Sequence, residues 1–180
     1  PRSGLSRADF LLNFGPWAAP ADAGEVGSGA WHNTSYKAEV LRSLGASLAS
    51  YLQVEGILFG ELRAWGLTIR LEPKAEALHV NFSRLRPFLL DKYAGRRSYA
   101  SARADHHRWS AARRLGYAVA WPLLTLLILR GVLREQRRRG RPWHLRARDV
   151  PVLALGAVAC AVGEAAGYVF GGGDAPRLKD

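Results

Sequence analysis

The spacing of apolar residues divides the chain into a first half of short elements and a second half of long ones. Apolar side chains recur at three- and four-residue steps through residues 48–65, which predicts an amphipathic helix. Residues 67–71 and 75–82 alternate apolar and polar side chains, as half-buried strands do. Residues 115–133 and 150–170 are almost continuously apolar, and each run is close to the ~20 residues that cross a bilayer.

Weaker signals surround these elements. Residues 1–29 are rich in Gly, Pro, Ala and Ser and contain one apolar segment, 10–14, which predicts a short helix or strand followed by a long loop. Ser35 and Glu39 bracket a second helix start, and Gly45 ends that helix. Gly66 is expected to cap the 48–65 helix.

Residues 84–114 predict amphipathic helices interrupted near Pro87 and Gly95. Basic and aromatic side chains alternate there, as they do in helices that lie among lipid headgroups. Single-stranded nucleic acid is the alternative partner, because it also uses arginines and stacking rings. The residues assigned to the membrane interface are Arg96, Arg97, Arg103, Arg108 and Trp109.

The charge distribution favours the membrane over nucleic acid. Lys and Arg outnumber Asp and Glu by 26 to 15, and the excess gathers around the two apolar runs. Cys160, the only cysteine, lies inside the second run, which excludes a disulfide framework and a thiolate metal site. Membrane lipid is therefore the expected partner, and no nucleic acid is expected.

The two apolar runs and the basic segment 134–149 between them predict a membrane hairpin. Pro122 is expected to kink the first run, Asp149 to cap the second, and Glu164 to face protein or water. Two core helices of a soluble domain are the alternative. The positive-inside rule places both 103–114 and 134–148 in the cytoplasm, which a hairpin that spans twice cannot satisfy. Either the first run is re-entrant or interfacial, or one basic cluster lies on the far side.

Candidate chemistry lies in residues 31–82. Glu55 is the one polar member of an otherwise apolar helix face, and a desolvated carboxylate there is unfavourable unless it is paired or open to a cleft. The alternative is that Glu55 begins a second helix after a break near Gln53, where the helix dipole favours a negative charge. His79 and Asn81 share one face of the predicted 75–82 strand, although a lone strand histidine is more often structural.

Short motifs between residues 31 and 122 occur in a recognisable order. They are His32-Asn33 before Ser35-Tyr36, the helix with Glu55, Ala64-Trp65-Gly66 before a strand, Glu72-Pro73-Lys74-Ala75, the segment with His79, and Gly95-Arg96-Arg97-Ser98-Tyr99-Ala100. Together they resemble the C-terminal half of bacterial family 2 glycosyltransferases, membrane-associated nucleotide-sugar enzymes of the GT-A fold. The resemblance covers about half the chain.

The resemblance implies a fold and a role for each residue. It implies a partial α/β, GT-A-like domain over 1–83, amphipathic basic interfacial helices over 84–114, two transmembrane segments within 115–171, and a polar tail over 172–180. Glu55 would be the catalytic base of a sugar transfer that inverts the anomeric centre. Trp31, His32, Asn33 and His79 would bind substrate, with His79 also able to approach a metal.

The resemblance also implies partners and a location. The donor would be a nucleotide sugar, the acceptor a glycan or a lipid-linked molecule, and the cofactor Mg or Mn. The enzyme would lie at the plasma (inner) membrane of the cell envelope, with its catalytic part facing the cytoplasm.

The chain departs from the family pattern in two respects. Gly56 follows the acidic residue where family members often have Asp, and no Asp-x-Asp motif occurs. The chain begins at Pro1 and contains no Met, so we expect the C-terminal portion of a longer product, inactive without its nucleotide-binding half. A non-catalytic basic module that binds membranes or nucleic acid, and a degenerate glycosyltransferase scaffold, remain as alternatives.

Overall fold

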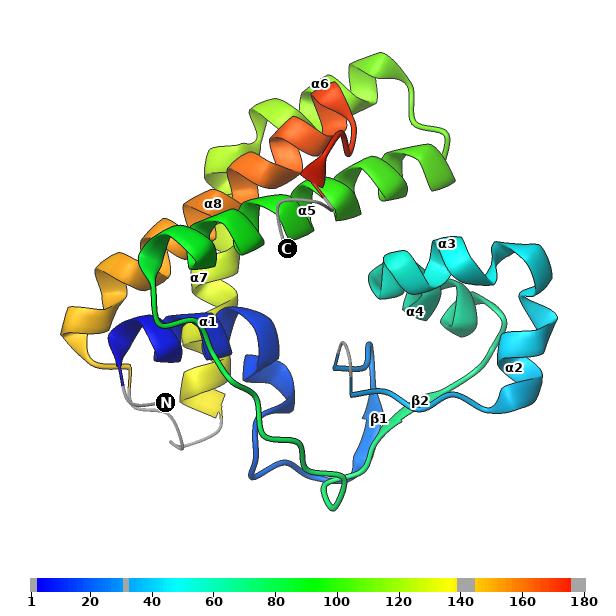
Figure 1. The fold of residues 1–180 in the computed structure, drawn as a ribbon, viewed down its shortest axis with the longest axis horizontal. Helices are drawn as coiled ribbons and strands as arrows, with labels where there is room; N and C mark the ends of the chain where they lie inside the picture. Colours follow the sequence, from blue (N-terminus) through cyan, green and yellow to red (C-terminus); the bar gives the residue numbers. More distant parts are fainter. Residues whose placement is uncertain (1–2, 31–32, 139–144, 176–180) are drawn as a thin grey trace. The chain divides into compact units, whose positions relative to one another are not determined.

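The computed structural model describes residues 3–30, 33–138 and 145–175, and these residues are mostly helical (Figure 1). Contacts divide the chain into two compact units. We call Trp17–Leu78 the mixed unit, and Pro1–Pro16 together with His79–Asp180 the helical unit.

The mixed unit contains three α-helices, two 3-10 turns and two strands within its described residues. Strands β1 and β2 pair antiparallel, with Glu25 opposite Arg70. Leu44, Leu58 and Leu62 form a small core between the helices. The elements are η1 (Gly15–Trp17, which begins in the helical unit), β1 (Gly24–Val26), α2 (Ala38–Ser43), η2 (Gly45–Ser47), α3 (Leu48–Gln53), α4 (Glu55–Ala64) and β2 (Ile69–Leu71).

The expected α/β content does not fit the described residues. Residues 75–82 form no strand, so that expectation was wrong, and 67–71 shortens to β2. The partner of β2 is β1, which lies in a segment expected to be loop. Alternation alone predicts a strand only where another strand is available for hydrogen bonding, and 75–82 has no such neighbour among the described residues.

The helical unit is built on two long helices that lie side by side, α5 (Leu85–His106) and α8 (Val150–Phe170) (Figure 1). They run parallel, because glycines of α8 meet successively later residues of α5. Gly156 lies against Phe88, Gly163 against the backbone of Tyr93, and Gly167 against that of Arg97. A Cβ atom at Gly163 or Gly167 would collide with an α5 carbonyl oxygen, so glycine is required for this close approach.

Shorter helices surround this pair. They are α1 (Gly4–Phe14), α6 (Ala111–Val119), α7 (Trp121–Arg138) and the turn η3 (Ala147–Asp149). α5 runs uninterrupted through Pro87 and Gly95, contrary to expectation. Pro87 is tolerated because it lies in the first turn, where its missing N–H has no intrahelical partner.

Buried charges in the helical unit are paired. Arg7 contacts Asp149 through two hydrogen bonds of 2.7 Å, which join α1 to the start of α8. Lys92 lies 2.6 Å from Asp9, and both side chains are almost fully buried. Asp149 is the N-cap residue of α8 as expected, but its carboxylate caps no N–H of that helix and binds Arg7 instead.

One segment among the described residues, Ala147–Phe170, is long and apolar enough to cross a membrane by itself. α6 and α7 meet that requirement only together, and they are bent by 58° where the chain passes from Val119 to Trp121. The kink expected at Pro122 is confirmed, because a proline in the first turn of α7 cannot continue the ladder from α6. The basic segment 134–149 lies partly outside the described residues.

Candidate functional site

Glu55 is the first residue of α4 and is half-buried. Val54 breaks the expected 48–65 helix into α3 and α4 with a backbone at φ −138° and ψ 71°. The alternative raised for Glu55, a second helix after a break near Gln53, is therefore the observed arrangement. The helix dipole stabilises the carboxylate, since the first amides of a helix carry partial positive charge.

Tyr36 determines where the Glu55 carboxylate points. The Tyr36 hydroxyl donates a hydrogen bond of 3.0 Å to Glu55 Oε1, and its ring stacks on Phe59, one turn further along α4. Burial raises the pKa of the Tyr36 phenol, and the charge and hydrogen bond of Glu55 raise it further. Tyr36 belongs to one of the sequence motifs, but its contact with Glu55 was not predicted. The sequence signal that could have identified it is that a half-buried carboxylate needs a hydrogen-bond donor nearby.

The segment before Tyr36 packs on the same helix. Gly29 lies against the Phe59 ring, where an added Cβ would come within 3.0 Å of it. The carbonyl of Ala30 accepts hydrogen bonds from the backbone N–H of Asn33 and from the Thr34 hydroxyl, which forms a tight turn. The side chain of Asn33 is exposed. Trp31 and His32, two of the predicted substrate-binding residues, lie outside the described residues.

His79 belongs to the helical unit and is held by its neighbours. Its Nδ1 lies 2.9 Å from Asn81 Oδ1, which requires Nδ1 to carry the proton, and its ring lies 4.3 Å from that of Phe14. The Asn81 amide donates in turn to Ser6. The expected pairing of His79 with Asn81 is present, although no strand carries it. These local contacts fit the structural interpretation of His79.

The predicted site therefore consists of two separately described parts, Glu55 in the mixed unit and His79 in the helical unit. Among the described residues, no three His, Cys, Asp or Glu side chains gather as a metal would require.

The basic residues assigned to a lipid interface make contacts inside the protein. Arg97 donates to the carbonyl of Gly171, and Arg103 donates to the Tyr168 hydroxyl and lies over the ring of Trp109. Trp109 is itself buried against Tyr168. The remaining two differ: Arg108 is exposed at the turn after α5, and Arg96 is partly exposed and lies 3.5 Å from Glu164.

Glu164 behaves as expected for an acid in an apolar helix. Its carboxylate faces protein, where it accepts a hydrogen bond of 2.9 Å from Tyr168 and lies near Arg96.

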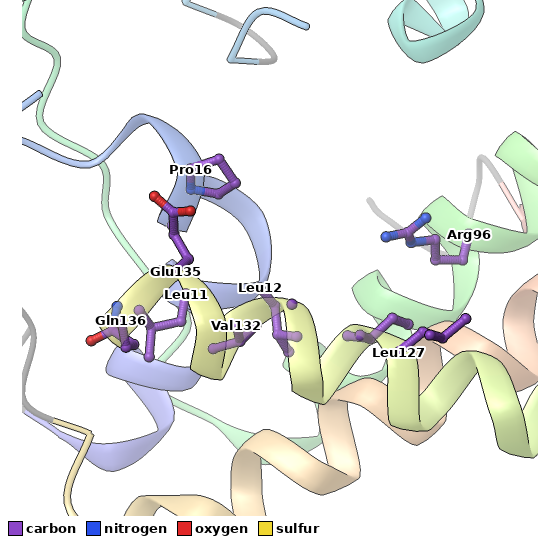
Figure 2. A pocket seen from close by; sticks show the side chains of 11 residues that line it. Leu11, Leu12, Pro16, Arg96, Leu127, Val132, Glu135 and Gln136 are labelled. Carbon is purple, nitrogen blue, oxygen red and sulfur yellow. The ribbon is translucent and has the colours of Figure 1, made fainter. Parts of the chain in front are cut away.

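A cavity of about 190 Å³ opens between α1, α5 and α7 of the helical unit. Figure 2 shows its apolar wall, in which Leu11 and Leu12 come from α1 and Leu127 and Val132 come from α7. Its polar groups are Arg96, Glu135 and Gln136. This lining suits an apolar group, and none of the predicted catalytic or substrate-binding residues belongs to it.

No protein-family model, curated protein or solved structure matches the chain. The resemblance to family 2 glycosyltransferases therefore depends on the ordered sequence motifs alone.

Proposed function

We propose that this chain is the acceptor-side, C-terminal portion of a membrane-associated family 2-like glycosyltransferase with a GT-A catalytic domain. The observation that carries the proposal is the contact between Tyr36 and Glu55. The motif around residues 32–36 and the acid of α4 are separate pieces of the sequence resemblance. Their contact in one compact unit is what an acceptor site built from both would need.

Glu55 would act as the general base. A carboxylate has about four hydrogen-bonding positions, so Tyr36 can hold one oxygen while the acceptor hydroxyl approaches another. Glu55 takes the hydroxyl proton as the acceptor oxygen attacks the anomeric carbon, and the nucleoside diphosphate leaves from the opposite face with the bonding electrons. This chain contributes two things to that step: Tyr36 positions the carboxylate, and Glu55 accepts the proton.

Donor binding belongs to a nucleotide-binding half, which the family pattern places before these motifs. The parallel strands of a GT-A domain and its Asp-x-Asp motif, with Mg or Mn, would come from that half. A glycan or lipid-linked acceptor would be reached at the plasma membrane, from the cytoplasmic side.

The base assignment is tested in the complete enzyme with the substitution Glu55→Gln. We expect kcat to fall about 10²- to 10⁴-fold, because general-base catalysis contributes that much, with little change in donor affinity. Glu39→Gln, at an exposed acid of the same unit, is the matched control and should transfer sugar normally. Near-normal turnover of Glu55→Gln across a panel of nucleotide sugars would exclude Glu55 as the base.

A further inference from the structure

The side of α8 that no helix covers is apolar from Leu155 to Val169. Leu155, Val158, Val162 and Val169 are each between 37% and 49% exposed. They recur at three-, four- and seven-residue steps, which places them on one stripe of the helix. We call these four residues the α8 stripe. Nothing charged interrupts it, so the stripe suits contact with lipid chains.

A different face of α8 is covered by α5, and α5 is strongly charged. Because the two helices run parallel from Phe88 beside Gly156 to Arg97 beside Gly167, residue 91 of α5 lies beside the middle of α8 and residue 96 beside its C-terminal third. The side chains at these two positions, Asp91 and Arg96, are partly exposed, at 28% and 34%.

This arrangement conflicts with a simple crossing of the bilayer by α8. If α8 spanned the membrane, α5 would be carried in beside it. Asp91 would then lie near the centre of the hydrocarbon, and Arg96 would lie between the centre and one interface. Charged side chains at these depths are disfavoured unless they are fully enclosed by protein or water. Lys92 and Asp9 are enclosed in this way, whereas Asp91 and Arg96 are not.

We infer that α8 lies in the plane of one membrane leaflet, with the α8 stripe toward the acyl chains and α5 on the headgroup side. The α8 stripe thus contacts the acyl chains of the bilayer. The helical unit is a monotopic membrane anchor, which enters one leaflet without crossing it. This arrangement also places the basic residues of 103–114 and the described basic residues of 134–138 and 145–148 on one side of the membrane, which a double-spanning hairpin cannot do. The inference rests on the membrane association in the proposed function.

The test uses single cysteines in a Cys160→Ala background, on the whole chain reconstituted in vesicles. Ala112, Ala147 and Asp174 are exposed positions in the first turn of α6, before α8 and after α8. A membrane-impermeant maleimide should label cysteines at all three positions from the same side. Labelling after detergent solubilisation is the control that each cysteine can react.

Depth along α8 gives a second, independent measurement. Spin labels at Leu155, Val162 and Val169, which lie on one line of the helix, should report similar shallow depths, about 5–10 Å into the interface, if the helix lies flat. A spanning helix would separate the first and last labels by about 21 Å of depth at 1.5 Å per residue. Relaxation by oxygen and by a water-soluble nickel complex distinguishes the two patterns.

The outcomes separate this inference from the proposed function. Labelling of the Ala147 and Asp174 positions from opposite sides, or a steep depth gradient, would overturn the in-plane arrangement while leaving membrane association intact. Recovery of the chain in the soluble fraction without detergent would overturn both. Same-side labelling with uniform depth supports the in-plane anchor.

Discussion

Tyr36 is the residue whose protonation most directly affects the candidate site. The ordinary pKa of its phenol is 10.0, and burial together with Glu55 raises that pKa in the folded state. Below pH 10 the phenol is protonated whether the chain is folded or not, so its contribution to stability is complete there. As pH rises above 10, the unfolded chain loses the proton first, and the stability of the mixed unit falls.

We therefore expect Tyr36→Phe to remove the part of the stability loss above pH 10 that comes from ionisation of this phenol. When near-ultraviolet absorbance is titrated against pH, the absorbance difference between wild type and Tyr36→Phe reports the ionisation of the Tyr36 phenol. This difference should appear above pH 10, because the pKa of that phenol is raised. Near neutral pH the variant should be destabilised by about 1 kcal/mol through the lost hydrogen bond to Glu55. Tyr99→Phe, at a tyrosine of α5, is the comparison. A difference titration centred at pH 10 would contradict the contact.

Loss of one partner of the buried pair Arg7 and Asp149 should reduce the stability far more than loss of one partner of a surface ion pair. Arg7→Met leaves a buried carboxylate without its main partner, and we expect a loss of about 3–5 kcal/mol in the free energy of unfolding. Adding Asp149→Leu should recover much of that loss, since two apolar side chains need no compensation. Arg86→Met, at an exposed position, is the control. Chemical denaturation in detergent micelles compares these three variants with the wild type.

The residue-scale expectations succeeded where a side chain was conspicuous for its surroundings. Glu164, an acid in an apolar run, does face protein, and His79 does pair with Asn81. Partners distant in sequence could not be predicted, because nothing local in the sequence connects Tyr36 with Glu55 or Arg7 with Asp149. Such contacts are set by which helices pack together.

At the scale of elements, the glycines of α8 decide how closely α5 and α8 approach. Gly163→Ala places a Cβ against the carbonyl of Tyr93, and we expect a destabilisation of about 1–3 kcal/mol from the forced separation. Gly131→Ala in α7 is the matched control, because open space surrounds that position. Since alanine favours helix, the control should be stabilised by up to about 1 kcal/mol.

Thermal or urea denaturation in micelles, followed by circular dichroism, distinguishes the two glycine variants. Equal effects of Gly163→Ala and Gly131→Ala would mean that α5 and α8 do not make the close contact seen here. Cross-linking of cysteines placed on α5 and α8 would then show whether the helices have separated.

Of the two long apolar runs, 150–170 was predictable with its bounds, whereas 115–133 is divided between α6 and α7. The 150–170 run became α8 with its expected bounds, because a long period of apolar residues specifies a helix without outside help. Residues 48–65 look like one helix, yet Val54 breaks them. Residues 75–82 alternate like a strand but lack a neighbour to pair with. Those outcomes depend on packing, which periodicity does not record.

At the scale of the whole molecule, two properties bear on which partner the chain binds: its net charge of +11 and its long apolar helices. The rival interpretation, a nucleic-acid module, needs aromatic rings free to stack on bases. Trp109, a prominent aromatic residue of the basic region, is instead buried against Tyr168 and covered by Arg103 and Arg113. That enclosure removes Trp109 from the rings that could stack on bases.

We accordingly expect both the positive charge and the apolar helices to contribute to the binding of vesicles. Binding to anionic phosphatidylglycerol vesicles should exceed binding to zwitterionic phosphatidylcholine vesicles, and added salt should reduce only that excess, because screening leaves apolar burial unchanged. Co-sedimentation at increasing salt measures this, with labelled single-stranded RNA as competitor. A nucleic-acid module would instead lose about 10³- to 10⁵-fold of its RNA affinity between 50 and 200 mM salt. If RNA displaced the chain from vesicles at low salt, and zwitterionic vesicles bound none of it, the apolar helices would not be acting as an anchor.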